Sequence, residues 1–272
     1  HPANRDPLWS RGLGDVYKRQ NGYHGVTLGA SSMTAKPYNK EFGLPSEEFI
    51  HIECPHYLKY GLENETEEEF SLRMAKNLEE KIIKEDPETI AGFVAEPVQG
   101  AGGCIPPSKS YFDLTQSILK KYNIPFIADE VICGFGRTGN LWGCETYNIK
   151  PDIIISSKCL TAGYFPMGAV IVNKEFSDKF VAVSEEAEEF PHGFTAGGHP
   201  VGCAIALKAI DVIMNEGLLD NVKLMEPYFF ERLNEFNDYE HIGETRGIGL
   251  MAALEMVKNN KLFVNMIVKM LS

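Results

Sequence analysis

The chain alternates between short apolar runs and longer stretches in which apolar residues recur every three or four positions. Short runs of about four to eight apolar residues are typical of buried strands, and the longer periodic stretches are typical of amphipathic helices. The predicted strands cover residues 49–52, 90–98, 124–128, 153–155, 168–172 and 248–256. The predicted helices cover residues 66–85, 108–119, 200–215 and 222–236. This alternation predicts an α/β fold with a mostly parallel sheet and helices on both faces.

The helix at 66–85 carries the clearest signals. Its apolar residues recur at every fourth position: Phe70, Met74, Leu78 and Ile82. Thr66 can cap its first turn, and the acidic residues 67–69 favour the positive end of the helix dipole. The helix at 200–215 is apolar on most faces, so we expect it to be buried. The acidic run at 184–189 is expected to be a solvated loop.

Composition and charge narrow the possible partners. Of the 272 residues, 44% are apolar and 24% are charged, which is ordinary for a globular protein, and the net charge is -12. Binding to nucleic acid needs clusters of Lys and Arg, so this acidic excess argues against it. No apolar run approaches the roughly 20 residues of a membrane helix. The six cysteines are scattered without a C-x-x-C motif, which predicts no metal and a reducing cytoplasm.

An aspartate and a lysine each follow a predicted strand. Asp129 ends the run at 124–128, and Lys158 follows the run at 153–155. Ligands of parallel α/β sheets bind at the carboxyl ends of the strands, so the two side chains can meet over one pocket. They are the groups that pyridoxal 5'-phosphate (PLP) needs. The lysine amine bonds to the cofactor, and the aspartate keeps the pyridine nitrogen protonated, so that the ring accepts electrons.

Each residue also has an ordinary structural interpretation. A lysine just past a strand is usually a solvated surface residue, and an Asp-Glu pair after a strand is often a helix cap. The neighbouring residues favour the cofactor. The glycines of 134–139 allow tight turns and a close backbone approach, and the small residues at 161–163 leave room for a ring.

Residues 127–163 resemble the signature of the class III, or omega, aminotransferases, a branch of the fold-type I PLP-dependent enzymes. The matching features are Asp-Glu-Val at 129–131, Gly-Phe-Gly-Arg-Thr-Gly at 134–139, Asp152, the small residue before Lys158, and Ala162-Gly163 after it. The resemblance extends over about residues 21–256, with further matches at 21–27, 95–103, 193–200 and 245–250. It implies a large PLP-binding domain with a mostly parallel, seven-stranded sheet in a homodimer.

The resemblance also implies which residues hold the cofactor. Lys158 would bind PLP covalently and move the proton between substrate and cofactor, and Asp129 would pair with the ring nitrogen. Val131 would pack on one face of the ring. Tyr23 would stack on the other face, although ordinary core packing is an equal alternative. His24 would contact the ring or support its turn.

Two further residues have implied roles outside the ring. Thr195 would reach across the dimer to the partner subunit's cofactor phosphate, and Glu96 would pair with a mobile substrate-binding arginine. Arg246 is interpreted as holding a domain junction. Ile132 stands where ornithine-type members carry glutamine, and together with residues 54–57 it favours the branch that acts on omega-amino acids or on amines with pyruvate.

The predicted reaction therefore moves an amino group from an amine or omega-amino acid to pyruvate or another 2-oxo acid. Two alternatives stay open: a class III aminomutase or decarboxylase, which shares the lysine and the aspartate, and a non-catalytic fragment.

The resemblance divides the chain into three parts. Residues 1–20 include Asp-Val-Tyr-Lys-Arg-Gln, which looks like a translated sequencing adapter; a natural basic segment is the alternative. Residues 21–240 are interpreted as the large PLP-binding domain without its N-terminal part, and residues 241–272 as the start of the C-terminal small domain. Because the family's phosphate loop and its carboxylate-binding arginine should lie outside the chain, we expect the chain by itself to be inactive.

Overall fold

The computed structural model describes residues 15–19, 22–34, 36–190, 192–258 and 261–269. The chain separates into two compact units. The first contains His1–Ala95 and Pro107–Phe126, and the second contains Glu96–Pro106 and Ile127–Ser272.

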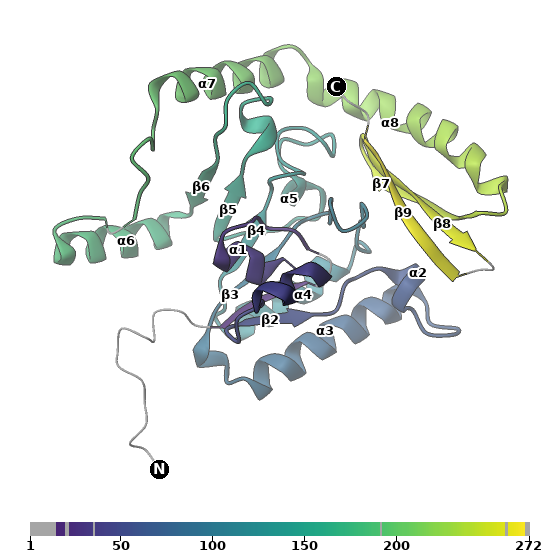
Figure 1. The fold of residues 1–272 in the computed structure, drawn as a ribbon, viewed down its shortest axis with the longest axis horizontal. Coiled ribbons are helices and arrows are strands. Elements are labelled where there is room, and N and C mark those ends of the chain that lie inside the picture. Colours follow the sequence, from purple (N-terminus) through teal and green to yellow (C-terminus); the bar gives the residue numbers. More distant parts are fainter. Residues whose placement is uncertain (1–14, 20–21, 35, 191, 259–260, 270–272) are drawn as a thin grey trace. The chain divides into compact units, whose positions relative to one another are not determined.

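Strands and helices alternate along the chain (Figure 1), and the predicted α/β class is confirmed. The strands are β1 Asp15–Arg19, β2 Phe49–Ile52, β3 Ile90–Ala95, β4 Phe126–Asp129, β5 Ile153–Ser156, β6 Ala169–Val172, β7 Ile242–Ile248, β8 Met251–Lys258 and β9 Lys261–Lys269. The α-helices are α1 Leu28–Met33, α2 Tyr57–Tyr60, α3 Glu67–Lys84, α4 Tyr111–Lys121, α5 Gly143–Thr146, α6 Lys174–Ala187, α7 Pro200–Asn215 and α8 Leu218–Asn234. Short 3-10 helices cover Pro37–Phe42, Pro87–Thr89, Lys158–Leu160 and Glu235–Asp238.

In the first unit, β1 pairs in parallel with both β2 and β3. No strand is expected within residues 1–20, because part of this segment looks like a translated sequencing adapter. The origin of these residues stays a prediction. The structure nevertheless places Asp15–Arg19 as the strand between β2 and β3.

Helix α3 forms where the sequence predicts a helix. Thr66 Oγ1 accepts the Glu69 N–H at 3.2 Å, and Glu69 Oε2 accepts the Thr66 N–H at 2.8 Å, which closes a capping box. The predicted apolar stripe is buried: Phe70, Met74, Leu78 and Ile82. Helix α4 contacts α3, and its N-cap is Ser110 rather than the expected Ser108.

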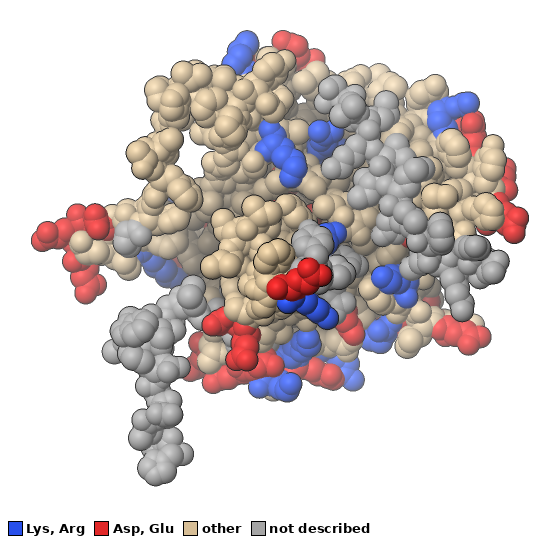
Figure 2. All heavy atoms as spheres, viewed as in Figure 1, with Lys and Arg blue, Asp and Glu red and all other residues tan. Residues whose placement is uncertain are grey.

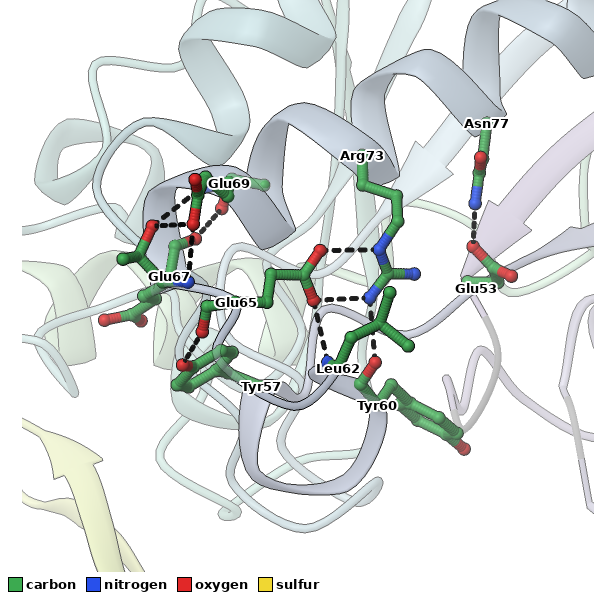
Figure 3. Close-up of polar contacts among 11 residues, drawn as sticks. Glu53, Tyr57, Tyr60, Leu62, Glu65, Glu67, Glu69, Arg73 and Asn77 are labelled. Atoms are coloured by element: carbon green, nitrogen blue, oxygen red, sulfur yellow. Dashed lines mark hydrogen bonds and ion pairs between the residues drawn. The ribbon is translucent and has the colours of Figure 1, made fainter.

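Arg73 on α3 holds the loop between α2 and α3 (Figure 3). Its Nε and Nη2 donate to Glu65 Oε1 and Oε2 at 2.6 and 2.7 Å, a bidentate pair. Arg73 Nη2 also donates to the Tyr60 carbonyl at 2.9 Å, and Glu65 Oε2 accepts the Leu62 N–H at 2.9 Å. The Glu65 side chain is only 9% exposed. This arrangement ties the loop to the first half of α3.

We expect the Glu65–Arg73 pair to stabilise the fold at neutral pH and to lose this effect in acid. The hydrogen bonds from Arg73, helped by the Leu62 N–H and opposed by burial, lower the pKa of Glu65 to about 2, against about 4.3 for an ordinary glutamate. A carboxyl group whose pKa is lower in the folded state stabilises the fold at pH values above its ordinary pKa. This stabilisation is lost as the pH falls towards the pKa of the folded state. Glu65→Gln should therefore lower the midpoint of thermal unfolding at neutral pH, and the difference from the unsubstituted chain should shrink below about pH 4.3.

The matched control is Glu80→Gln on α3, the helix that carries Arg73. Glu80 lies 3.7 Å from Lys76, and both side chains are well exposed, so this substitution should change the unfolding midpoint little at any pH. A Glu65→Gln difference that stays constant from neutral to acidic pH would contradict the expectation.

In the second unit, β4 pairs in parallel with β5, and β5 pairs antiparallel with β6. The strands β7, β8 and β9 form a separate antiparallel sheet. The predicted strand at 248–256 begins too early, because the chain turns at Gly249 between β7 and β8. Gly249 has φ +58°, and a Cβ there would lie 2.3 Å from the Arg137 carbonyl oxygen, which only glycine avoids.

Two expectations about the surface of the second unit are wrong. Helix α7 buries Gly202, Ala206 and Ile213, but Leu207 is 69% exposed, so the helix is not buried on most faces. The acidic run at 184–189 lies partly in α6 rather than in a loop, and Figure 2 shows acidic side chains gathered at this end of α6. No helix in the described ranges has the length and apolarity that a membrane span requires.

Candidate functional site

Asp129 is the last residue of β4. The strand forms because its first three residues are apolar, and Phe126 and Ala128 are buried. The Asp129 side chain is only 2% exposed, and its Oδ1 accepts the Val131 N–H at 3.0 Å. A buried carboxylate is therefore held at the strand end by the backbone that follows it.

Lys158 follows β5 at the same edge. Asp129 lies opposite Ile155 in the parallel pairing, and the Glu130 N–H donates to the Ile155 carbonyl at 2.8 Å. Only Ser156 and Ser157 separate Ile155 from Lys158. The register thus brings the aspartate and the lysine to the carboxyl ends of neighbouring strands, as the sequence predicts. Their chemical roles stay predictions.

The backbone of Lys158 is in an uncommon conformation. Its φ is +44°, in the left-handed region that non-glycine residues rarely adopt, and the residue begins a 3-10 turn. The Lys158 side chain is exposed. Such a backbone costs on the order of 1–3 kcal/mol and persists where the surrounding structure enforces it, often at functional sites. The lysine that the sequence predicts to bind the cofactor therefore lies in a constrained turn shortly after β5.

Glu130 is a buried acid next to Asp129, and no role for it is expected from the sequence. Its side chain is fully buried, and its Oε2 and Oε1 accept the N–H groups of Gly143 and Cys144 at 2.9 and 2.7 Å. Burial raises the pKa of Glu130, while its hydrogen bonds with Cys144 and Gly143 oppose the rise. Its position directly after the strand-end Asp129 is the one feature of the sequence that could indicate a role. Its partners, Gly143 and Cys144, lie too far along the chain to be predicted from the spacing of residues.

The other predicted site residues are distributed over both units. In the second unit, Val131 is half-buried, and Thr195 is exposed in the segment between α6 and α7. Glu96 is buried, and its Oε2 accepts the Gly100 N–H at 2.8 Å. Tyr23 and His24 belong to the first unit, where both are half-buried and the His24 N–H donates to Thr34 Oγ1 at 2.9 Å. Within the described part of the chain, no cluster of His, Cys, Asp and Glu is placed to hold a metal ion.

Arg246 on β7 uses its donors inside the second unit. Its Nη2 lies 2.6 Å from Oε2 of the buried Glu255, and its Nη1 lies 3.0 Å from Glu244 Oε2. Its Nε and Nη2 also donate to the Gly103 carbonyl at 3.1 and 2.7 Å. These partners engage the guanidinium of Arg246, and its interpretation as a residue at a domain junction stays a prediction.

Comparisons with known proteins agree on one family. The model of the family described as aminotransferase class-III matches residues 11–271, beyond the resemblance at 21–256 on both sides. Among curated proteins, gamma aminobutyrate transaminase 1, mitochondrial, of Solanum lycopersicum is 51% identical over 242 residues, which are 89% of this chain and 47% of that protein.

Solved structures give the same result. An omega-aminotransferase from Paracoccus denitrificans is 60% identical with a TM-score of 0.90, over 92% of this chain and 56% of that one. The PMP-bound form of an aminotransferase from Vibrio fluvialis is 59% identical with a TM-score of 0.91, over 94% of this chain and 57% of that one. The chain thus spans about half the length of the relatives that it matches.

Proposed function

Because this chain belongs to the class III aminotransferases, we propose that it forms the cofactor-binding part of an enzyme that moves an amino group from an amine or omega-amino acid to pyruvate or another 2-oxo acid. The observation that carries the proposal is the register of β4 and β5, which places Asp129 and Lys158 at one edge. The fold is that of the fold-type I PLP-dependent aminotransferases, and PLP is the cofactor of this family.

The residues at this edge fit PLP. Lys158 is an exposed residue that carries the amine needed for covalent attachment, and the buried carboxylate of Asp129 would supply the negative charge that a protonated ring nitrogen needs. When bound, PLP supplies the electron sink that lets the substrate carbon lose a proton. Lys158 moves that proton as general base and acid. We also propose that Val131 packs on one face of the ring, that Tyr23 stacks on the other face, and that His24 contacts the ring or supports its turn.

Outside the ring, we propose that Thr195 reaches the phosphate of the partner subunit's cofactor in a homodimer, and that Glu96 pairs with the arginine that otherwise receives a substrate carboxylate. The compartment that we propose is the cytoplasm, because no disulfide joins the cysteines in the described part of the chain. Two plant relatives carry the words mitochondrial and chloroplastic in their names.

The test of the reaction is product analysis with the protein that carries this sequence. An amine donor and pyruvate should yield alanine and the ketone or aldehyde of the donor in equal amounts, and the two half-reactions should follow ping-pong kinetics. The Lys158→Ala variant serves as the inactive control.

Other products would support the competing reactions. An amino group that moves within one molecule would indicate an aminomutase, and release of carbon dioxide without alanine would indicate a decarboxylase. Either result would contradict the proposed transfer while leaving the role of PLP intact.

A further inference from the structure

Glu130 is bonded through its backbone and its side chain to three neighbouring segments. Its N–H donates to the Ile155 carbonyl of β5, and its carbonyl accepts the Gly134 N–H, both at 2.8 Å. Its carboxylate accepts the N–H groups of Gly143 and Cys144 in the first turn of α5. One residue thereby joins the end of β4 to β5, to the glycine-rich turn and to α5.

The residues on either side of Glu130 are bonded to each other. Asp129 precedes it, Val131 follows it, and the Val131 N–H donates to Asp129 Oδ1 at 3.0 Å. This hydrogen bond links the direction of the Asp129 carboxylate to the backbone at 130–131. A movement of Glu130 relative to Asp129 would change it.

The surroundings of the Glu130 carboxylate leave it little freedom. A Cβ at position 143 would lie 3.1 Å from Glu130 Oε2 and 2.6 Å from the Cys133 Cβ, so the helix start can approach this closely only because residue 143 is glycine. The first N–H groups of a helix have no partner inside the helix and need an acceptor. A fully buried carboxylate is costly unless it is hydrogen-bonded, and here two amide donors supply the compensation.

We propose that Glu130 is a positioning residue for Asp129: by holding α5 and β5 against the end of β4, it fixes the direction in which the Asp129 carboxylate faces the cofactor. The part of this inference that concerns the cofactor rests on the proposed function. The part that concerns Asp129 can be tested without PLP.

The first experiment is amide hydrogen exchange at residue resolution on the chain without cofactor. Glu130→Gln keeps the size of the side chain but turns an NH₂ group towards one of two N–H donors. The Val131 amide reports the hydrogen bond to Asp129, and its exchange should become at least about tenfold faster. Exchange of the amides at residues 143 and 144 should also become faster, while the exchange rates of amides in α8 should stay unchanged.

The matched control is Glu145→Gln. Glu145 is exposed and lies on α5, next to Gly143 and Cys144, and its Oε2 accepts the Trp142 N–H at 3.1 Å. This substitution should leave exchange at Val131 unchanged. Faster exchange at 143 and 144 with unchanged exchange at Val131 would show that Glu130 only anchors α5, and would overturn the proposal. Uniformly faster exchange along the chain would overturn it as well.

A second variant covers the case in which Glu130→Gln does not fold. Glu130→Asp keeps the charge but is one methylene shorter, so it cannot reach both amides, and it should show the same pattern at Val131. If neither variant folds, Glu130 is needed for folding itself, and a specific role towards Asp129 is refuted.

The second experiment is a double-mutant cycle on PLP affinity in the protein that carries this sequence. Glu130→Gln should raise the Kd for PLP about tenfold or more in the native background and little in an Asp129→Asn background, because its effect passes through Asp129. An equal change in both backgrounds would contradict the proposal. Absence of PLP binding together with faster exchange at Val131 would refute the proposed function and retain the role of Glu130.

Discussion

Replacement of Lys158 by alanine should abolish covalent attachment of PLP and stop transamination. Lys158 is an exposed residue in the turn that follows β5, and its amine is the group that we propose attaches to PLP. A general acid–base residue contributes about 10²- to 10⁴-fold to a rate, and the loss of covalent attachment adds to this. We therefore expect the rate of amino transfer to fall by at least about 10⁴-fold.

The measurement is borohydride reduction of the PLP-loaded protein followed by peptide mapping. The reduced cofactor should be found on Lys158 alone, and the alanine variant should carry no label. Lys174→Ala is the control, because Lys174 is an exposed lysine of the same unit that pairs with Asp178 on α6. A label on any other lysine would show that the assignment of Lys158 is wrong.

Replacement of Asp129 by asparagine should leave PLP bound but slow the half-reaction by several orders of magnitude. Asparagine has nearly the same shape, and its carbonyl oxygen can still accept the Val131 N–H, so the turn should persist. The substitution removes a negative charge from a site that is only 2% exposed, where charge interacts strongly with the ring. Without that charge the ring nitrogen loses its proton and accepts electrons poorly.

Stopped-flow absorbance of the half-reaction with an amine donor measures this effect, and PLP content is determined in parallel. Asp178→Asn, on the exposed surface of α6, should have a normal rate. A normal rate in Asp129→Asn would mean that another group keeps the ring nitrogen protonated. Loss of PLP without a folding defect would mean that Asp129 acts mainly in binding.

Local patterns were enough to predict α3 and the carboxyl ends of β4 and β5. The helix at 66–85 was predicted nearly at its observed bounds, because the cap, the acidic first turn and the apolar stripe all lie within one element. Asp129 and Lys158 could be placed at one edge because parallel strands end on the same side of a sheet.

Features that depend on distant partners could not be predicted in this way. Glu130 owes its role to amides in α5, and its own neighbours in the sequence do not reveal them. The exposure of Leu207 on α7 depends on what packs against the helix, whereas its apolar composition alone predicted burial. Strand β6 runs antiparallel to β5, a direction that a single apolar run does not encode.

The pairing of β4 with β5 also determines which changes in chain length the site can tolerate. The relative positions of Asp129 and Lys158 depend on the paired residues of the two strands, which run from Ile127 opposite Ile153 to Asp129 opposite Ile155. They do not depend on the length of the connection between the strands. Residues inserted in an exposed part of that connection would leave the two side chains in place. Deletion of a single residue within β5 would instead shift the register and turn every following side chain to the opposite face. Natural insertions among relatives should therefore be found between these two strands and not within them.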